Sequence, residues 1–287
     1  MSKYNYNKDY FAVINNEEKA YWLGFLYADG CINRYYKNDK LKAMNLELSL
    51  CKNDYNHLEK FLLALESNVP IHKKNVTYQN KQYEEYRIEV CCTKMCYDLI
   101  NLGCTPQKTF NISFPTEEIV PKIYIRDWLR GFFDGDGCIS TYVIDGSNHI
   151  VTFFCGIETM MNEVADFLNH EKIIRKKLHI YHDKRSKCCE IRIYGKDTNK
   201  EFLDYLYKDS TIYLDRKYNK YIEFYKDYQD IEKQGVYWSK TNNAYIVTIA
   251  KGKYYKRIGQ TKDLQEAINM RKEAEYDLFI NGCPLDQ

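Results

Sequence analysis

Two stretches of the chain carry nearly the same motif 107 residues apart. Residues 22–32 read WLGFLYADGCI and residues 129–139 read LRGFFDGDGCI, so that Asp29 of the first aligns with Asp136 of the second. Each motif is followed by an alternating strand pattern, a helical pattern, a further strand and a further helix. A period this long exceeds that of solenoid repeats. It predicts two fused half-domains related by an approximate two-fold axis.

The acids of the second motif are compatible with a calcium loop, a hairpin turn or a helix end. A loop of the EF-hand type is excluded because its fifth and sixth positions, counted from Asp134, hold Cys138 and Ile139. A two-residue hairpin needs alternating strands on both sides, yet the preceding segment, IYIRDWLRGFF, has its apolar residues at helical spacing. The pattern therefore favours a helix over residues 121–135.

Local signals predict where both motif helices begin and end. Pro121 suits the first turn of the second helix. Asn15 and Glu18 form a capping-box pattern at the start of the first helix. Each helix ends at Asp-Gly, where Gly30 and Gly137 are free to adopt the left-handed conformation that commonly terminates a helix.

Each motif helix carries two small residues four positions apart, Gly24 and Ala28 in the first and Gly131 and Gly135 in the second. Two such bare ridges can pack with their backbones unusually close, which would bring the two motif aspartates together. A carboxylate at a helix C-terminus is unfavourable by roughly 0.3–1 kcal/mol, and two of them repel. Because a bound divalent cation would reverse both penalties, the pattern predicts a metal site.

The paired motifs resemble those of the LAGLIDADG homing endonucleases in their monomeric two-repeat form. WLGFLYADG and LRGFFDGDG match the family's nonapeptide at the first glycine, the small residue, the aspartate and the last glycine, while Tyr27 departs from it. The resemblance covers about residues 10–228. It implies an α+β fold of two pseudo-symmetric αββαββα half-domains, residues 1–114 and 115–228, packed through their motif helices.

The resemblance also implies an activity, namely site-specific hydrolysis of both strands of double-stranded DNA by a monomer. In this family divalent cations, Mg²⁺ with Mn²⁺ as a substitute, activate water and stabilise the leaving oxygen. A lysine in each half often lies near the scissile phosphate. The matching positions of this chain are the catalytic, metal-binding Asp29 and Asp136, the assisting backbone carbonyls of Ala28 and Gly135, and the catalytic Lys108 and Lys217.

A curved sheet from each half is implied to lie in the DNA major groove. The segments expected to contact bases are residues 33–52 and 78–89 in the first repeat, and 142–152 and 184–192 in the second. Which side chains read which bases depends on the faces of the strands, and the sequence leaves that open.

A polar linker, residues 229–234, precedes a C-terminal segment with its own charge balance. Six basic residues and no acid lie between Gly235 and Lys262. Residues 235–287 resemble an AP2-type DNA-binding domain of three strands and a packing helix. The resemblance implies DNA contacts from five side chains, those of Trp238, Lys240, Tyr245, Lys253 and Arg257; the alternative is that Trp238 and Tyr245 pack on the helix and the basic residues are solvated.

The net charge and the cysteines bear on the partner of the protein and on its compartment. A net charge of +2 neither demands nor excludes nucleic acid. Eleven cysteines without a signal-peptide pattern or a membrane span predict reduced thiols in a cytoplasmic protein, nucleoid-associated in a bacterial or phage-infected cell. A zinc group is conceivable from His179, His182, Cys188 and Cys189, but the flanks of these residues favour the two strands of a hairpin.

Two other functions suit the same scaffold. One is a DNA-binding transcriptional regulator that does not cleave, and the other is a maturase that binds group I intron RNA. Intact motif aspartates favour the nuclease over the regulator, since a regulator would be free to lose them. Nothing in the sequence separates the maturase from the nuclease, and either suits a gene carried by a mobile intron or standing alone.

Overall fold

The computed structural model describes residues 3–78, 80–108, 111–144, 147–182, 188–232, 235–251 and 254–281. The chain divides into two compact units, Met1–Tyr221 and Ile222–Gln287. Lys253, expected to contact DNA, lies outside the described residues, as does most of the stretch between Lys184 and Cys188. None of the described helices combines the length and the apolar character that crossing a bilayer requires.

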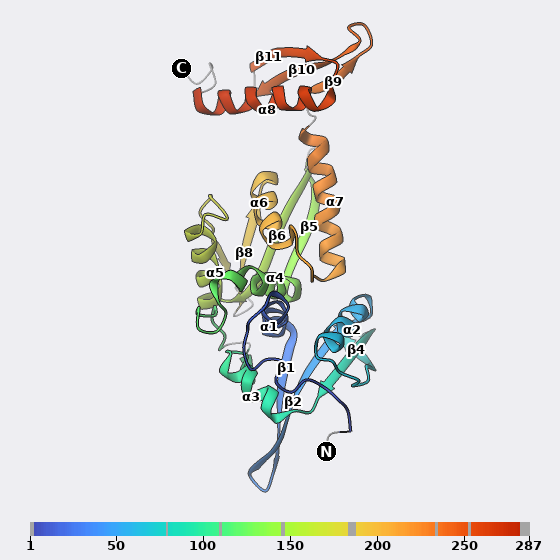
Figure 1. Ribbon diagram of the computed structural model, residues 1–287, viewed down its shortest axis with the longest axis vertical. Coiled ribbons are helices and arrows are strands. Elements are labelled where there is room, and N and C mark those ends of the chain that lie inside the picture. Colours follow the sequence, from blue (N-terminus) through green and yellow to red (C-terminus); the bar gives the residue numbers. More distant parts are fainter. Residues whose placement is uncertain are drawn as a thin grey trace. The chain divides into compact units, whose positions relative to one another are not determined.

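The first unit contains the same succession of elements twice (Figure 1). The first copy comprises α1 (Glu17–Asp29), β1 (Gly30–Lys37), β2 (Lys40–Cys51), α2 (Tyr55–Ala64), β3 (His72–Tyr78), β4 (Lys81–Val90) and α3 (Thr93–Asn101). The second comprises α4 (Ile125–Asp136), β5 (Gly137–Ile144), β6 (Ser147–Ile157), α5 (Glu158–His170), β7 (Ile180–His182), β8 (Cys188–Tyr194) and α6 (Lys196–Tyr207), after which α7 (Asp215–Glu232) begins. This arrangement confirms the predicted α+β fold of two αββαββα halves.

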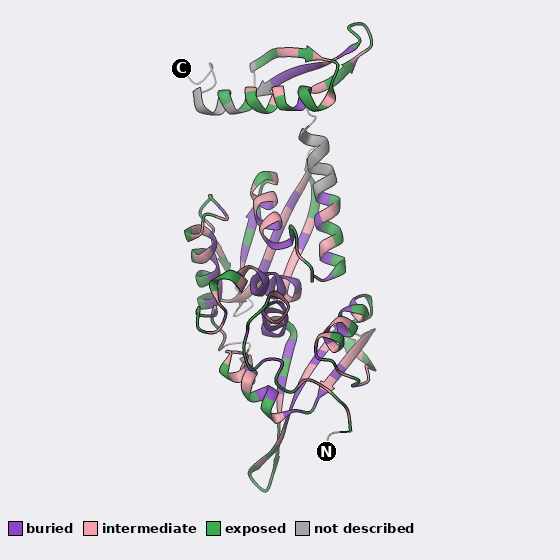
Figure 2. Cartoon of the chain, viewed as in Figure 1, coloured by how far each residue is buried: buried purple, intermediate pink, exposed green. Residues whose placement is uncertain are grey.

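Each copy builds one four-stranded antiparallel sheet. The strand orders are β1-β2-β4-β3 and β5-β6-β8-β7, so the two sheets have the same topology. Buried and accessible side chains alternate along the inner strands: Leu46, Leu48 and Ile88 are buried, whereas Glu47 and Arg87 between them keep contact with solvent. Each sheet therefore has one face in the core and one open face (Figure 2).

Helices α1 and α4 pack against each other with almost no side chain between them. A Cβ added to Gly24 would lie 1.9 Å from the Trp128 carbonyl oxygen, and one added to Gly131 would lie 1.9 Å from that of Tyr21. A Cβ on Gly135 would lie 2.2 Å from the Cβ of Ala28. Figure 2 shows both helices buried over most of their lengths. The small residues thus let the two backbones touch.

The predicted beginnings of the motif helices are wrong in detail. The N-cap of α1 is Asn16, whose side chain accepts a hydrogen bond from the Lys19 amide, and not Asn15. Glu18 instead accepts a hydrogen bond from the Tyr10 hydroxyl at 2.9 Å. Pro121 precedes a short 3₁₀ helix, Lys122–Tyr124, that leads into α4. A tertiary contact of Glu18 replaces the local capping box.

The predicted left-handed ends of these helices are also wrong. Gly30 has φ −72° and ψ 148°, and Gly137 has φ −92° and ψ 166°, which is extended backbone. The chain passes directly from each helix into a strand, so no left-handed turn is formed. Glycine is needed there for space, because a Cβ on Gly137 would lie 2.4 Å from the Phe133 carbonyl oxygen.

The segment considered for zinc forms a hairpin. Strands β7 and β8 pair antiparallel, with His182 opposite Cys189, as the alternating pattern predicted. Within the described part of the chain, no three His, Cys, Asp or Glu side chains gather in a way that could hold a metal ion. No disulfide joins the ten cysteines that the structure describes, and their reduced state stays a prediction.

The second unit is a small sheet with one helix. Strands β9 (Val236–Ser239), β10 (Ala244–Lys251) and β11 (Tyr254–Thr261) form an antiparallel sheet in the order β11-β10-β9, and α8 (Leu264–Asn281) follows. The buried side chains between its sheet and this helix come from β10 and α8, among them Val247 and Ala267. The three-stranded sheet with one helix is the architecture predicted for this segment.

Replacing Gly131 with alanine tests the close packing of the motif helices. Because the new Cβ would lie 1.9 Å from the Tyr21 carbonyl oxygen, α1 and α4 must separate. We expect Gly131→Ala to lower the free energy of unfolding by about 1–3 kcal/mol or more, measured by urea denaturation. Glu59→Ala, at an exposed position of α2, is the control and should stay within about 0.5 kcal/mol of the wild type. Equal stabilities of the two variants would contradict the packing argument.

Candidate active site

The two motif aspartates end the two packed helices. Asp29 is the last residue of α1 and Asp136 the last of α4. A Cβ on Gly135 would lie 3.3 Å from Oδ2 of Asp29, so this carboxylate reaches across to the end of the partner helix. Burial among protein atoms, and then the charge of Asp136, raises the pKa of Asp29 to about 6, although its side chain is open to solvent. Burial also raises the pKa of Asp136.

The two predicted lysines bind the carbonyl ends of the motif helices. The ammonium of Lys108 donates to the carbonyl oxygens of Ala28 at 2.9 Å and Gly30 at 2.5 Å. Lys217 donates to the carbonyl oxygens of Phe133 at 2.6 Å, Asp134 at 2.7 Å and Gly135 at 3.3 Å. A cation at a helix C-terminus interacts favourably with the dipole. Each lysine therefore offsets part of the penalty that its helix imposes on the neighbouring aspartate.

Burial distinguishes the two lysines. Lys217 is 1% exposed, and burial lowers its pKa to about 8 despite the opposing charges of Asp134, Asp29 and Asp136. Lys108 is half-buried. Both lysines lower the pKa of Asp29 through their charge. The four predicted catalytic side chains therefore lie close enough together for their charges to interact.

The aspartate pair fits a divalent cation. Among the described residues, neither Asp29 nor Asp136 accepts a side-chain hydrogen bond or forms an ion pair. Two neighbouring, unpaired carboxylates repel each other, and a hard cation bound through one or two carboxylates takes its remaining oxygen ligands from water and phosphate. The carbonyls of Ala28 and Gly135, expected as further ligands, each accept a hydrogen bond from a lysine and keep a second lone pair, so their role as ligands stays a prediction.

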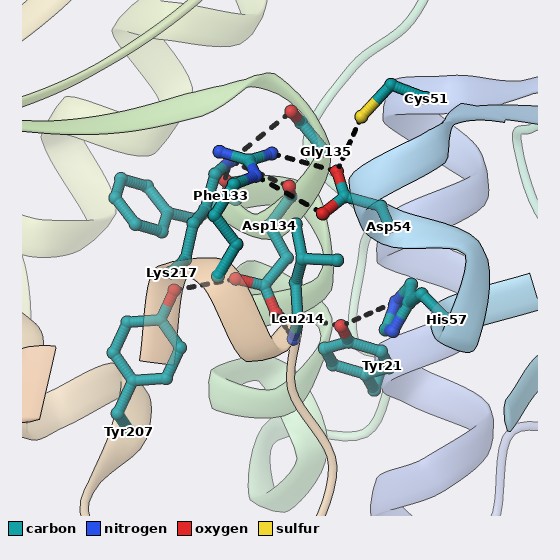
Figure 3. A network of polar contacts seen from close by, with 11 residues as sticks. Tyr21, Cys51, Asp54, His57, Phe133, Asp134, Gly135, Tyr207, Leu214 and Lys217 are labelled. Carbon is teal, nitrogen blue, oxygen red and sulfur yellow. Dashed lines mark hydrogen bonds and ion pairs between the residues drawn. The ribbon is translucent and has the colours of Figure 1, made fainter. Parts of the chain in front are cut away.

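A buried carboxylate next to the pair organises the second half of the site (Figure 3). Asp134 is 1% exposed and accepts hydrogen bonds from the Tyr21 hydroxyl at 2.7 Å, the Tyr207 hydroxyl at 2.6 Å and the Leu214 amide at 2.7 Å. Burial raises its pKa, and the charge of Lys217 acts against this rise. Asp134 thereby ties α1, α6 and the start of α7 to the motif helix α4.

The Tyr21 hydroxyl extends this network into α2 of the first repeat. His57 is 2% exposed, and its Nε2 lies 3.0 Å from the Tyr21 oxygen. Because Tyr21 gives its single proton to Asp134, Nε2 of a neutral His57 carries the proton of this contact. Burial lowers the pKa of His57 to about 3. The ring is therefore neutral at the pH of the cell.

The first repeat also holds the start of α7, and with it Lys217. Arg216 donates to both carboxylate oxygens of Asp54, at 3.2 and 3.1 Å. The Lys60 ammonium donates to Asp215 at 2.6 Å and to the Tyr213 carbonyl oxygen at 3.1 Å. The position of Lys217 thus depends on both repeats.

The motifs differ at one matching position, and the structure shows the consequence. Tyr27 of the first motif corresponds to Asp134 of the second. The Tyr27 hydroxyl donates to the Leu102 carbonyl oxygen at 2.5 Å and occupies the space beside Gly103, where a Cβ would lie 2.0 Å from it. Both residues fasten their helix to the end of the last helix of the same repeat, α3 or α6, Tyr27 with a hydroxyl and Asp134 with a carboxyl group.

The side chains expected to contact DNA in the second unit fall on different faces. Trp238 and Tyr245 pair across β9 and β10, and their rings lie 4.8 Å apart edge to face. The register places both on the same side as Gly259, whose Cβ would meet Met270 of α8 at 2.4 Å. This is the side on which α8 packs, yet Trp238 is 45% exposed and Tyr245 is half-buried, so DNA contact by Trp238 and Tyr245 stays a prediction.

The basic residues of this unit are open to solvent. Lys240 lies exposed in the turn after β9, and exposed Arg257 donates to Gln260 at 2.6 Å. Arg257 pairs with Thr248, which faces away from Val247 and the helix. Tyr237, 53% exposed, lies on the same side of the sheet, although its partner Ile246 is buried. This side therefore presents an exposed aromatic residue that the sequence did not single out.

Removing the Asp134 carboxylate tests the network. Asp134→Ala leaves two buried hydroxyls and one amide without their acceptor, and an unpaired buried polar group costs about 1–3 kcal/mol. We expect a loss of about 3 kcal/mol or more in the free energy of unfolding, measured by denaturant titration. Asp134→Asn keeps one acceptor oxygen and should lose clearly less. An alanine variant as stable as the asparagine variant would refute the assignment of Asp134 as the hub.

The buried His57 predicts a pH dependence of stability. Its pKa is about 3 in the folded state and about 6.5 when unfolded, so below pH 6.5 only the unfolded chain takes up the proton. Stability should therefore fall as the pH drops from about 6.5 towards 3, by about 2 kcal/mol at pH 5 from this group. Denaturation of wild type and His57→Gln at pH 7 and pH 5 isolates this contribution. Identical losses in both proteins would rule it out.

Comparisons with known proteins agree with this geometry. A family model described as a LAGLIDADG-like domain matches residues 124–207. Among curated protein sequences, none matches the chain. The fold is similar to that of the LAGLIDADG homing endonuclease I-GzeII in complex with its DNA target, with 15% identity and a TM-score of 0.52 over 77% of this chain and 92% of that one.

Two further structures are similar to the same extent. The LAGLIDADG meganuclease I-AabMI bound to uncleaved DNA has 13% identity and a TM-score of 0.51, over 77% of this chain and 93% of that one. I-SmaMI bound to an uncleaved DNA target in the presence of calcium ions has 11% identity and a TM-score of 0.52, over 92% of this chain and 99% of that one. Residues 124–207, within the second repeat, thus match the model of a LAGLIDADG-like domain, and the two repeats together have a fold similar to that of the LAGLIDADG homing endonucleases.

Proposed function

We propose that the protein is a site-specific endonuclease that hydrolyses both strands of double-stranded DNA with the help of divalent cations. The observation that carries the proposal is the pair of unpaired carboxylates, Asp29 and Asp136, at the touching ends of α1 and α4. Each helix continues directly into the first strand of a sheet with an open face. The acids therefore lie between two surfaces suited to reading a groove.

Asp29 and Asp136 would hold the cations, of which Mg²⁺ is the one we propose and Mn²⁺ a substitute. When bound, such ions supply an activated water and stabilise charge on the attacking and leaving oxygens. Residues of the chain itself determine the electrostatic potential around the two aspartates. Lys108 and Lys217 keep two positive charges beside the carboxylates, which favours the anionic form of the pair and attracts a phosphate.

Double-stranded DNA is the proposed partner of the open sheet faces. I-GzeII, I-AabMI and I-SmaMI, which share the fold, are each described as bound to DNA. A two-stranded β-ribbon fits the major groove, where every base pair has a distinct pattern of donors and acceptors. A monomer with two unequal sheets can bind an unsymmetrical target, since no second copy is needed to supply the other half-site.

The second unit is proposed to add affinity for the same DNA. Lys240, Arg257 and Tyr237 lie exposed on it, and basic side chains gain affinity by contacting phosphates whatever the base sequence. Tethering such a unit to a specific binder strengthens binding without a new specific contact. An AP2-like mode of contact through the sheet stays a prediction.

Substituting one motif aspartate tests the proposed reaction. Duplexes are selected for binding from a random library in Ca²⁺, and the bound sequences are then incubated with Mg²⁺. We expect the wild type to cut both strands and Asp29→Asn to lose at least about a hundredfold in rate, because several kcal/mol of charge stabilisation disappear. Asp29→Asn should keep its stability, since it also removes a carboxylate that repels Asp136.

Asp166→Asn, the same change at an exposed position of α5, is the control and should cut at the wild-type rate. Tight, sequence-specific binding by the wild type without cleavage in Mg²⁺ or Mn²⁺ would reject the nuclease. The protein would then be a DNA-binding regulator on the same scaffold.

A further inference from the structure

The residues that pair across neighbouring strands form sets, and we call each set a rung. The rungs of the two sheets can be compared in order, starting from the glycine that follows each motif aspartate. Gly30 pairs with Leu48, and Leu48 with Ile88. In the second repeat Gly137 pairs with Phe154, and Phe154 with Ile191. These two rungs are equivalent, and their side chains on the inner strands are buried. The rungs on either side of them therefore point to the open faces.

The rung beyond the glycine, further from the motif aspartate, carries opposite charges in the two sheets. In the first sheet it is Cys31–Glu47–Glu89, and in the second it is Cys138–Phe153–Arg192. The rung before the glycine, nearer the motif aspartate, shows the reverse, with Ser49–Arg87 in the first sheet and Cys155–Glu190 in the second. Along β4 the arginine precedes the glutamate, whereas along β8 the glutamate precedes the arginine.

Both arginines are accessible and held by an acid of the same strand. Arg87 is 31% exposed, and its Nη1 lies 3.2 Å from Glu89 and 3.6 Å from Glu47. Arg192 is 43% exposed, and its Nε and Nη2 each lie 2.7 Å from Oε2 of Glu190. Pairs this exposed contribute little to stability. Their acids instead hold each guanidinium in place on the open face.

Arginine and glutamate together match one base pair. A guanidinium donates two hydrogen bonds to O6 and N7 of guanine in the major groove, and a glutamate accepts from N4 of cytosine. A surface that offers both groups two residues apart on one strand can meet a G·C pair and its neighbours. Of the remaining open-face residues of these rungs, Glu47 is a second acid beside Glu89, and the others are a phenylalanine, a serine and cysteines.

We propose that Arg87 and Arg192 each read a guanine in the major groove, and that the reversed order of charge makes the DNA target unsymmetrical at this place. The proposal rests on the proposed function, since it assigns bases to the same DNA-binding faces. Arg87 lies one rung towards the motif aspartate and Arg192 one rung away from it. Residues two apart on a strand are separated by about 6.8 Å, which is about two base-pair steps of 3.4 Å. The guanine of the first half-site should therefore lie about two base pairs nearer the centre.

Selection of bound duplexes from a random library in Ca²⁺ tests this assignment with the full chain. The proteins are the wild type, Arg87→Gln, and a double variant, Arg87→Glu with Glu89→Arg, that gives β4 the charge order of β8. We expect Arg87→Gln to lower the preference for guanine at one position of one half-site by about ten- to a hundredfold. The double variant should move that guanine outward by about two base pairs in the same half-site.

Lys37→Gln, at an exposed end of β1, is the control and should weaken binding to all sequences without changing the selected bases. Each variant should unfold on heating at the same temperature as the wild type, which verifies that its fold is intact. A target that is palindromic at these steps would overturn the proposal, as would unchanged selection by Arg87→Gln. Failure of the wild type to enrich any duplex would instead reject DNA binding itself, and the proposed function with it.

Discussion

The rest of the structure depends on the contact between α1 and α4. Gly24 and Gly131 each meet a backbone carbonyl of the other helix, and Gly135 meets Ala28 near the helix ends. Because no side chain separates the backbones, the last residues of both helices are forced close together. The two carboxylates then lie close to each other and among protein atoms, which raises the pKa of Asp29 to about 6. An unfavourable electrostatic arrangement is thus built into the main interface of the fold.

The surrounding side chains make this arrangement tolerable without cancelling it. Lys108 and Lys217 bind the helix-end carbonyls, so their positive charges are fixed by the backbone and not by the aspartates. The carboxylates form no ion pair among the described residues, which leaves them available for the proposed cation. Three hydrogen bonds offset the cost of burying Asp134. One of them, from the Leu214 amide, fixes the segment from which Lys217 projects. Stability and the proposed chemistry therefore share the same residues.

The sequence predicted the framework of the site because the patterns that indicate it each span only a few residues. The motif spacing, the pairs of small residues and the terminal aspartates lie within single helical turns, and the two copies reinforce each other. The exact N-cap and the conformations of Gly30 and Gly137 were predicted wrongly. In both cases a contact outside the local pattern decided the outcome, Tyr10 meeting Glu18 in one and a strand following at once in the other. Asp134 could have been noticed as an acid between buried aromatic residues of a helix, but its partners are 73 to 113 residues away.

By itself, the sequence determined the duplication, the packing of the motif helices, the paired acids and the open strands, since each depends on periodicity or on residue size over a few positions. Only the tertiary structure decided which side chains line the open faces, which carbonyls the lysines bind and where the charges of β4 and β8 fall relative to the motif glycines. Those features depend on register and on contacts between segments far apart in the chain. A shift of one residue in a strand reverses every side chain, and no local pattern records such a shift.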